Sequence, residues 1–301
     1  MAELPTELLM KDHVMAASQI GVQLEQGSLT MLLGAGVSKG MGLPLWWELV
    51  KYCCDHLGLD SSNIDSTTSN EELRLKMDSV EKKAGKRNAY HDLVREKLYA
   101  SAKDDGYLLD QKLLIVLGAM MMNSRRGSVK EILTFNFDDV LERYLSLHGF
   151  VHQITTSLPC LQRDVDVTIH HPHGFLASSA KFKASDSDFL VFSQYSYDTR
   201  QAGGPNQDDL WKNLTRDLLL RKTGLFVGLS RHDPEWGSLL VQVKNLTNQS
   251  RITGFWLLGP SDDTSSESYL RDRNVVPIRL KSYEDYVPFL LSVCQSAAVS
   301  S

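Results

Sequence analysis

The feature that most limits the possible folds is a short apolar run that ends in a glycine turn. Residues 29–33 read Leu-Thr-Met-Leu-Leu and lead directly into Gly34-Ala35-Gly36. An apolar strand that enters Gly-x-Gly permits a tight turn and a close backbone approach to a pyrophosphate. The next glycine is Gly40, one place later than in the usual dinucleotide fingerprint. By itself, this turn is as consistent with a plain strand-to-helix connection as with a dinucleotide-binding loop.

Strand-like runs alternate with helix-like segments along the rest of the chain. The strand-like runs are residues 29–33, 131–135, 151–155, 167–169, 189–192, 224–227, 252–258 and 275–280. The helix-like segments are residues 46–57, 71–101, 113–122, 139–147, 208–221, 234–246 and 283–294. Such alternation favours a mostly parallel sheet that is covered on both faces. We therefore predict an α/β fold with a Rossmann-like, doubly wound sheet, and we interpret the Ser- and Asp-rich stretch 261–268 as a loop.

The chain length allows one large domain with a smaller part inserted. Its 301 residues are near the upper limit for a single hydrophobic core. Residues 71–101 alternate in charge sign and lack strand character, which indicates exposed helices. We predict one domain over residues 1–301, with its core at 1–57 and 126–301 and a helical insertion at about 58–125.

Composition disfavours several classes of protein. A net charge of -5 without a long basic run argues against direct nucleic-acid binding. The sequence shows neither a signal peptide nor an apolar run of the roughly 20 residues that cross a membrane, so we expect a cytoplasmic protein. Its four cysteines are Cys53, Cys54, Cys160 and Cys294, and none forms a Cys-x-x-Cys pair. We therefore expect no structural zinc site.

Four short segments follow one another in a distinctive order. Residues 34–38 read Gly-Ala-Gly-Val-Ser and are followed by Gly-Leu-Pro at 42–44. Residues 134–138 read Thr-Phe-Asn-Phe-Asp, residues 173–174 read His-Gly, and residues 228–230 read Gly-Leu-Ser. Each segment alone is a weak signal, but the ordered set resembles the sirtuin, or Sir2-like, family. The resemblance implies a Rossmann-like fold that binds NAD.

The resemblance also implies which residues hold the phosphates and ribose of NAD. The first loop would cradle the pyrophosphate, and its lining residues would be Gly34, Ala35, Gly36 and Ser38. The late Gly-x-Ser segment would contact the phosphate and the adenosine-side ribose through Gly228 and Ser230.

Three further residues would serve the chemistry at the nicotinamide end. By the resemblance, Asn136 binds the nicotinamide-side ribose or orients a water, Asp138 contacts or braces the pocket, and His173 is a general base. An Asn amide can donate and accept hydrogen bonds at once, and a histidine titrates near neutral pH. Neighbouring His170 and His171 are interpreted as structural or rim residues. Asp139 is expected to cap the following helix.

The chain differs from the family's protein deacylases in two features, and these differences limit which reaction we expect. The family's protein deacylases carry paired zinc cysteines and a Pro-Asp-Phe-Arg segment, whereas residues 44–47 here read Pro-Leu-Trp-Trp. Their absence resembles the zinc-less bacterial branch that acts in anti-phage defence and hydrolyses NAD. We therefore predict an NAD+ hydrolase that consumes NAD as its substrate, needs no zinc, and arrests infected cells by NAD depletion. The tryptophans Trp46 and Trp47 either close over the nicotinamide end or pack in the core.

A constantly active enzyme of this kind would be toxic, so we expect control by homo-oligomerisation or by a protein partner. Within the resemblance, a HerA-type ATPase is favoured over an Argonaute-like protein or a phage component. Two other functions stay open. One is a non-catalytic NAD- or nucleotide-binding scaffold subunit, which would need neither Asn136 nor His173. The other is an NAD-dependent protein deacylase or ADP-ribosyltransferase, of which the missing cysteine pairs disfavour only the deacylase.

Overall fold

A single parallel sheet organises the chain, for which the computed structural model describes residues 6–122, 129–161, 163–178, 190–202, 207–230, 234–247 and 251–299. The strands are β1 (Leu29–Leu33), β2 (Glu131–Thr134), β3 (His152–Thr155), β4 (Val167–His170), β5 (Thr223–Val227), β6 (Gly254–Leu258) and β7 (Val275–Arg279). Within the described residues they form one sheet in the order β3-β4-β2-β1-β5-β6-β7, and all neighbouring strands are parallel. The predicted doubly wound α/β fold is thus confirmed.

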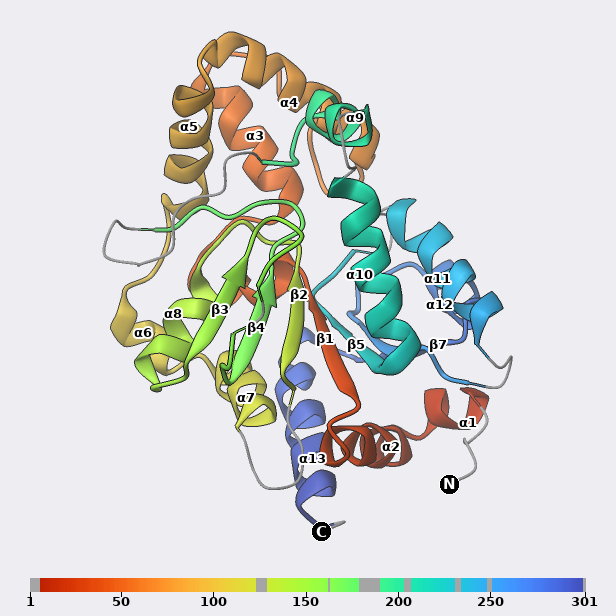
Figure 1. The fold of residues 1–301 in the computed structure, drawn as a ribbon. Coiled ribbons are helices and arrows are strands. Elements are labelled where there is room, and N and C mark those ends of the chain that lie inside the picture. The colour runs from red at the N-terminus through yellow and green to blue at the C-terminus, as the bar shows by residue number, and fades with distance from the viewer. Residues whose placement is uncertain are drawn as a thin grey trace.

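Helices cover both faces of this sheet (Figure 1). The α-helices are α1 (Thr6–Lys11), α2 (His13–Glu25), α3 (Trp46–His56), α4 (Asn70–Ala84), α5 (Arg87–Tyr99), α6 (Asp105–Leu109), α7 (Lys112–Met121), α8 (Val140–Leu147), α9 (Gln194–Ala202), α10 (Gln207–Arg221), α11 (Pro234–Leu246), α12 (Ser265–Arg271) and α13 (Tyr286–Val299). Short 3-10 helices are η1 (Ala35–Val37), η2 (Lys39–Met41) and η3 (Tyr283–Asp285). In the described ranges, no helix is both long enough and apolar enough to cross a membrane.

Side chains alternate between the two faces along β1, as a pleated strand requires. Leu29, Met31 and Leu33 belong to the larger apolar core, which α2, α7, α8 and α13 also line. Leu32 points the other way, into a second apolar cluster with residues of α10, α11 and α12. Burial on both faces explains why the strands read as continuous apolar runs rather than as alternating ones.

The strand order places a topological switch point between β1 and β5. From β1 the chain moves to β2 and the strands beyond it, and then returns to form β5 on the other side of β1. In open doubly wound sheets, ligands bind outside the carboxyl ends of the strands at such a point. Gly34 follows β1 and Gly228 follows β5, so the two glycine segments seen in the sequence meet there.

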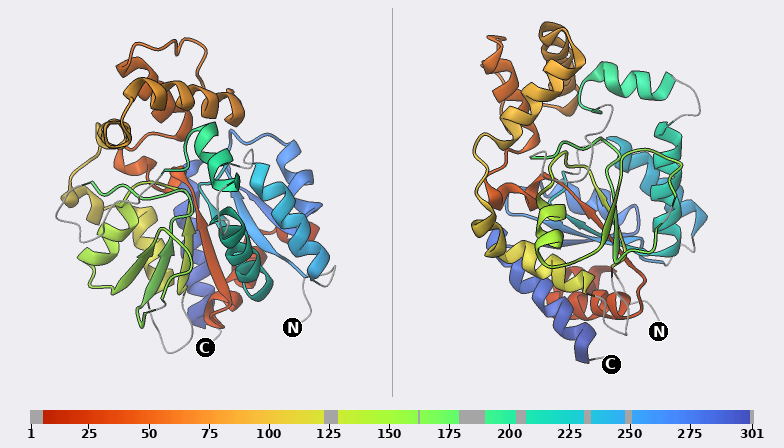
Figure 2. Two further views of the ribbon diagram at one scale, coloured as in Figure 1. Left: turned by 45° about the horizontal axis from the view of Figure 1, so that its top comes forward. Right: turned by 60° about the vertical axis from the view of Figure 1, so that its left-hand side comes forward.

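Helices α3, α4, α5 and α9 lie together beyond the carboxyl ends of the strands (Figures 1 and 2). Helix α3 packs against α4 and α5, and α4 packs against α9. Helix α7 ends the same connection between β1 and β2 and packs against α13 on the core. The boundaries of the helical insertion, at about 58–125, stay a proposal.

Two local predictions are corrected by the structure. The predicted strand 189–192 is absent over the described residues 190–192, and residue 189 lies outside the described ranges. There the amide of Val191 donates to the carbonyl of His173 (2.8 Å), and the amide of Phe192 donates to Ser196 Oγ (2.9 Å), so neither joins a sheet. The predicted loop 261–268 becomes helical at Ser265, whose amide donates to Asp263 Oδ1 (3.1 Å).

We predict that the aromatic stack between β5 and β6 contributes strongly to stability. Phe226 and Trp256 are buried and stack with ring centroids 4.5 Å apart. Phe226→Ala should lower the free energy of unfolding by about 3–5 kcal/mol, because it removes a buried aromatic ring and leaves a cavity. Leu246→Ala, at a side chain that is 64% exposed, should change it by about 0.5 kcal/mol at most. Chemical denaturation measures both, and equal losses would contradict this prediction.

Candidate active site

The loops after β1 and β5 touch backbone to backbone. The amide of Gly34 donates to Val227 O (3.0 Å), and that of Gly36 donates to Gly228 O (3.1 Å). A Cβ on Gly34 would lie 2.4 Å from Gly228 O, and one on Gly36 would lie 2.8 Å from Gly228 Cα. Gly228 also has a φ of 67°, in the left-handed region. The contact between the two loops therefore requires glycine at all three positions, before any ligand is considered.

Asn136 follows β2 and is tied to the first glycine loop through its side chain. Its amide nitrogen Nδ2 donates to Gly34 O (3.1 Å) and to Ser38 Oγ (3.2 Å). No hydrogen bond from the described part of the chain reaches its amide oxygen Oδ1. The sequence prediction gave this amide both a donor and an acceptor role, but both amide hydrogens face protein oxygens. Asn136 therefore offers a ligand an acceptor.

Asp138 connects the first glycine loop to the start of α8. Its Oδ1 accepts from Ser38 Oγ (2.9 Å) and from the amide of Val140 (3.1 Å), which begins α8. The residue expected to cap α8, Asp139, makes no side-chain bond to that helix end. Instead, Asp139 Oδ2 accepts from the amide and the hydroxyl of Ser178, both at 2.7 Å. Asp139 thus stands at the N-cap position, as predicted, but its side chain does not cap the helix, because Ser178 binds its carboxylate and Asp138 accepts from the first helical amide.

Buried carboxylates gather under Asn136. Asp138, Asp139 and Glu142 have little or no exposed surface. Burial raises the pKa of Asp138 to about 7, and the neighbouring Glu142 adds to the rise. Burial also raises the pKa of Asp139, against the lowering effect of the hydrogen bonds from Ser178. The carboxyl group of Asp138 is therefore near its midpoint of titration at neutral pH.

His171 links two of the segments. Its Nδ1 lies 3.0 Å from the carbonyl oxygen of Asn136, and its Nε2 lies 2.8 Å from Glu142 Oε1. A carbonyl only accepts, so Nδ1 donates the bond to Asn136 O, while Nε2 faces the carboxylate of Glu142. Both side chains are fully buried, at 0% and 1% exposure. The pair holds the backbone of Asn136. The sequence analysis expected a structural or rim role for His171 but did not identify Glu142, whose signal was a charged residue four places after Asp138 in the next helix.

His173 lies on the loop after β4, the strand that pairs with β2. Its ring is buried and meets Phe135 and Tyr197 edge-on, at centroid distances of 5.0 and 5.6 Å. The amide of Gly174 donates to His171 O (3.1 Å) and closes the turn. The adjacent strand ends thus bring His173 and Asn136 to the same edge of the sheet.

His170 lies apart from this cluster. Its ring packs edge-on against Trp211 of α10 at 6.0 Å, and burial lowers its pKa to about 4. This neutral, buried ring fits the structural role expected of it. No group of three or more His, Cys, Asp and Glu residues that could hold a metal occurs in the described ranges.

The remaining predicted residues lie at the edge of the same site. Ala35 begins η1 and is half-buried, and Trp46 packs against Phe192 with ring centroids 4.6 Å apart. Ser230 is exposed and is the last described residue before the gap at 231–233. The contacts therefore join the glycine loop, Asn136, Asp138 and Gly228 directly, while Ser230 lies at the end of the second loop.

Comparison with known proteins identifies the family of the chain. Residues 130–278, about half of the chain, match the family model described as a SIR2-like domain. The chain belongs to the SIR2-like family. No curated protein matches the chain. Members of the SIR2-like family are NAD-dependent enzymes, so an NAD-related function follows.

The SIR2-like match covers Asn136, His173, Gly228 and Ser230, and begins after the first glycine loop. That loop joins the matched region through its contacts with Gly228 and Asn136. The family recognised from four ordered segments is confirmed. The role of each residue in binding or catalysis stays a proposal.

We predict that Gly228→Ala destabilises the SIR2-like fold more than left-handed backbone strain alone explains. Gly149 also has a positive φ, of 78°, but a Cβ there would meet nothing within 4 Å. Gly149→Ala should therefore cost about 1–2 kcal/mol in unfolding free energy from backbone strain. Gly228→Ala should cost clearly more, because its Cβ would lie 2.8 Å from the amide nitrogen of Val37. Urea denaturation compares the two, and equal losses would count against the loop contact.

We also predict that Asp138→Asn changes how stability depends on pH. Asn keeps an oxygen acceptor for Ser38 and Val140 but does not titrate. Because the pKa of Asp138 rises from 3.8 to about 7 on folding, the wild-type free energy of unfolding falls as pH increases between these values. The variant lacks this contribution, so its stability relative to the wild type should rise over that interval. Parallel stability curves for the two proteins would show that Asp138 keeps an ordinary pKa.

Proposed function

We propose that this chain is an NAD+ hydrolase that cleaves the bond between nicotinamide and ribose. The products are ADP-ribose and nicotinamide. The observation that carries the proposal is the position of Asn136, whose amide oxygen is presented beside the glycine loop at the switch point of the sheet. Family membership supports NAD as the substrate.

The two glycine loops suit the phosphate part of the substrate. In the proposal, Gly34, Ala35, Gly36 and Ser38 line the pyrophosphate. Gly228 and Ser230 of the second loop contact the phosphate and the adenosine-side ribose. The two glycine loops meet at the carboxyl end of β1, where doubly wound folds bind nucleotides.

The reaction breaks one bond at C1′ and forms one there, and it moves one proton from water to a base. The electron pair of the C1′–N bond leaves with nicotinamide, a water oxygen bonds to C1′, and the water releases a proton. We assign His173 as the base that takes this proton. Asn136 accepts a hydrogen bond from the water or from a ribose hydroxyl through Oδ1, and so orients it. Asp138 braces Ser38 and the loop.

Water is favoured over an acyl peptide as the acceptor. The four cysteines form no zinc-ribbon pairs, and Leu45-Trp46-Trp47 stands where the deacylases have Asp-Phe-Arg. Trp46 packs on Phe192, which in turn packs on Phe137 at 5.2 Å, so aromatic rings cover this side of the Asn136 loop.

The proposal extends to a biological role. We propose a cytoplasmic effector of bacterial anti-phage defence, which arrests infected cells by depleting NAD. Such an effector requires control, which we assign to homo-oligomerisation or to a partner, with a HerA-type ATPase as the first candidate.

A direct assay tests the proposed activity. The protein is incubated with NAD+, with and without an acetylated peptide, and nicotinamide and ADP-ribose are separated by chromatography. We expect free ADP-ribose without peptide. Asn136→Ala and His173→Ala should each lower the rate by about 100-fold or more, because each removes a group that orients or activates the water.

The matched control is His148→Ala, at the far end of α8, which should retain wild-type activity. If nicotinamide were released only in the presence of peptide, the proposed hydrolase would be wrong and the function would be that of a deacylase. Absence of release under every condition, including with a HerA-type ATPase added, would leave the scaffold function instead.

A further inference from the structure

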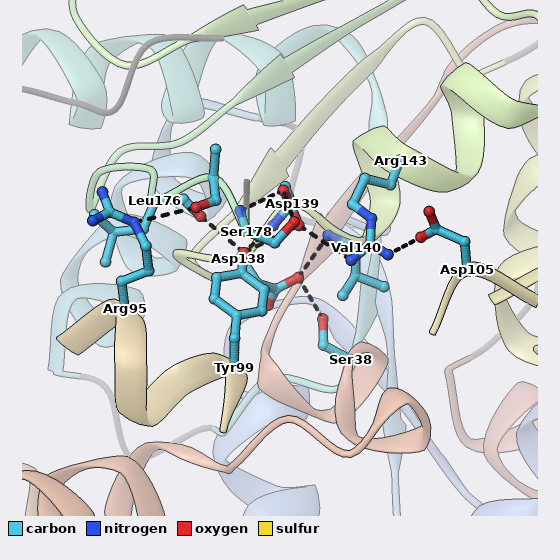
Figure 3. A network of polar contacts seen from close by, with 11 residues as sticks. Ser38, Arg95, Tyr99, Asp105, Asp138, Asp139, Val140, Arg143, Leu176 and Ser178 are labelled. Atoms are coloured by element: carbon cyan, nitrogen blue, oxygen red, sulfur yellow. Dashed lines mark hydrogen bonds and ion pairs between the residues drawn. The ribbon is translucent and has the colours of Figure 1, made fainter. Parts of the chain in front are cut away.

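One hydroxyl group from α5 contacts both loops that carry the proposed catalytic residues. Tyr99 Oη donates toward Leu176 O (2.8 Å) and Asp139 Oδ1 (3.1 Å), and it accepts from the amide of Asp139 (2.9 Å) (Figure 3). Burial raises the pKa of Tyr99 well above its usual value, so the hydroxyl keeps its proton and stays a donor. Tyr99 therefore uses its full hydrogen-bonding capacity on these two loops.

The two partners occupy equivalent places in their segments. Asp139 comes three residues after Asn136, and Leu176 comes three residues after His173. The segments also bond to each other, since the amide of Leu176 donates to Phe137 O (2.7 Å). Holding Asp139 and Leu176 against one hydroxyl thus sets the separation of the two loops.

Further contacts attach the same helical region to these loops. Arg95 Nε of α5 donates to Ala177 O (3.2 Å), the residue after Leu176. Arg143 of α8 pairs with Asp105 of α6 and lies 3.8 Å from Asp139 Oδ1 (Figure 3). The carboxylate of Asp139 is therefore contacted from α5, from α8 and from Ser178.

We propose that Tyr99 is a positioning residue that holds the Asn136 and His173 segments at the separation that the reaction requires. We call Tyr99, Asp139, Leu176 and Ser178 the clasp. Without the hydroxyl, the buried amide of Asp139 has no acceptor there and the carbonyl of Leu176 loses its donor, so the loops relax. The kinetic part of this inference rests on the proposed NAD+ hydrolysis; the structural part does not.

Tyr99→Phe tests the clasp with a matched control on the same helix. Tyr90 is also buried on α5, and among the described residues its hydroxyl has no hydrogen-bond partner. Tyr90→Phe therefore removes the same atom without touching the clasp. We expect Tyr99→Phe to lower kcat about 10- to 100-fold, since a small misplacement of reacting groups has effects of that size. KM for NAD+ should change far less, because the hydroxyl of Tyr99 bonds to Asp139 and Leu176 and not to the glycine loops.

Hydrogen–deuterium exchange gives a readout that does not depend on activity. Peptides that cover residues 134–142 and 171–178 should exchange faster in Tyr99→Phe than in Tyr90→Phe or wild type. Faster exchange with an unchanged kcat would reduce Tyr99 to a purely structural role, and equal exchange and kcat in both variants would overturn the proposal entirely. If the wild type does not cleave NAD+, the proposed hydrolase function is wrong. The hydrogen–deuterium exchange rates of the two peptides then decide by themselves whether Tyr99 holds the loops.

A second variant covers the case in which Tyr99→Phe does not fold. Ser178→Ala removes one hydroxyl bond to Asp139 and leaves the amide bond of Ser178 in place. It should raise exchange in the same two peptides and lower kcat by a smaller factor. Wild-type exchange and kcat in Ser178→Ala would also contradict the clasp.

Discussion

The close contact between the backbones of the β1 and β5 loops is the constraint on which the site depends. Gly36 donates to Gly228 O, and the carbonyl of Gly34 accepts from Asn136. The loop after β2 is therefore positioned on the loop after β1, which is itself positioned on the loop after β5. A side chain at Gly34, Gly36 or Gly228 would push the two loops apart, because its Cβ would lie only 2.4–2.8 Å from atoms of the other loop. The site thus depends on backbone packing before it depends on any catalytic side chain.

Buried carboxylates connect these loops to the neighbouring helices. Burying charge is costly unless hydrogen bonds compensate, and here the compensation is local and specific. Asp138 faces Ser38 and the start of α8, Asp139 faces Ser178 and Tyr99, and Glu142 faces His171. Each acidic group ties the Asn136 segment to a different neighbour. A network of this kind permits few alternative arrangements, so it fixes the loop more narrowly than apolar packing would.

The fold and the position of the site were predictable from the sequence, whereas the polar support was not. Alternating strand and helix patterns, together with glycines at strand ends, predict a parallel sheet and a site at its carboxyl edge. The strand expected at 189–192 failed, because apolar residues such as Leu190 and Phe192 pack as a buried loop whose amides bond elsewhere. Tyr99 gave no signal, since its partners are 40 and 77 residues away.

Contacts from the helices between β1 and β2 reach both proposed catalytic loops by separate routes. Helix α4 bonds to the start of α9, where Ser193 Oγ donates to Glu81 Oε2 (2.6 Å), and Tyr197 of α9 packs on His173. Helix α5 acts through Tyr99 on the Asn136 loop. The sheet positions the start of the Asn136 and His173 loops, whereas contacts from α4 and α5 help to position the rest of each loop. A movement of α4 and α5 would therefore reach the His173 loop and the Asn136 loop together.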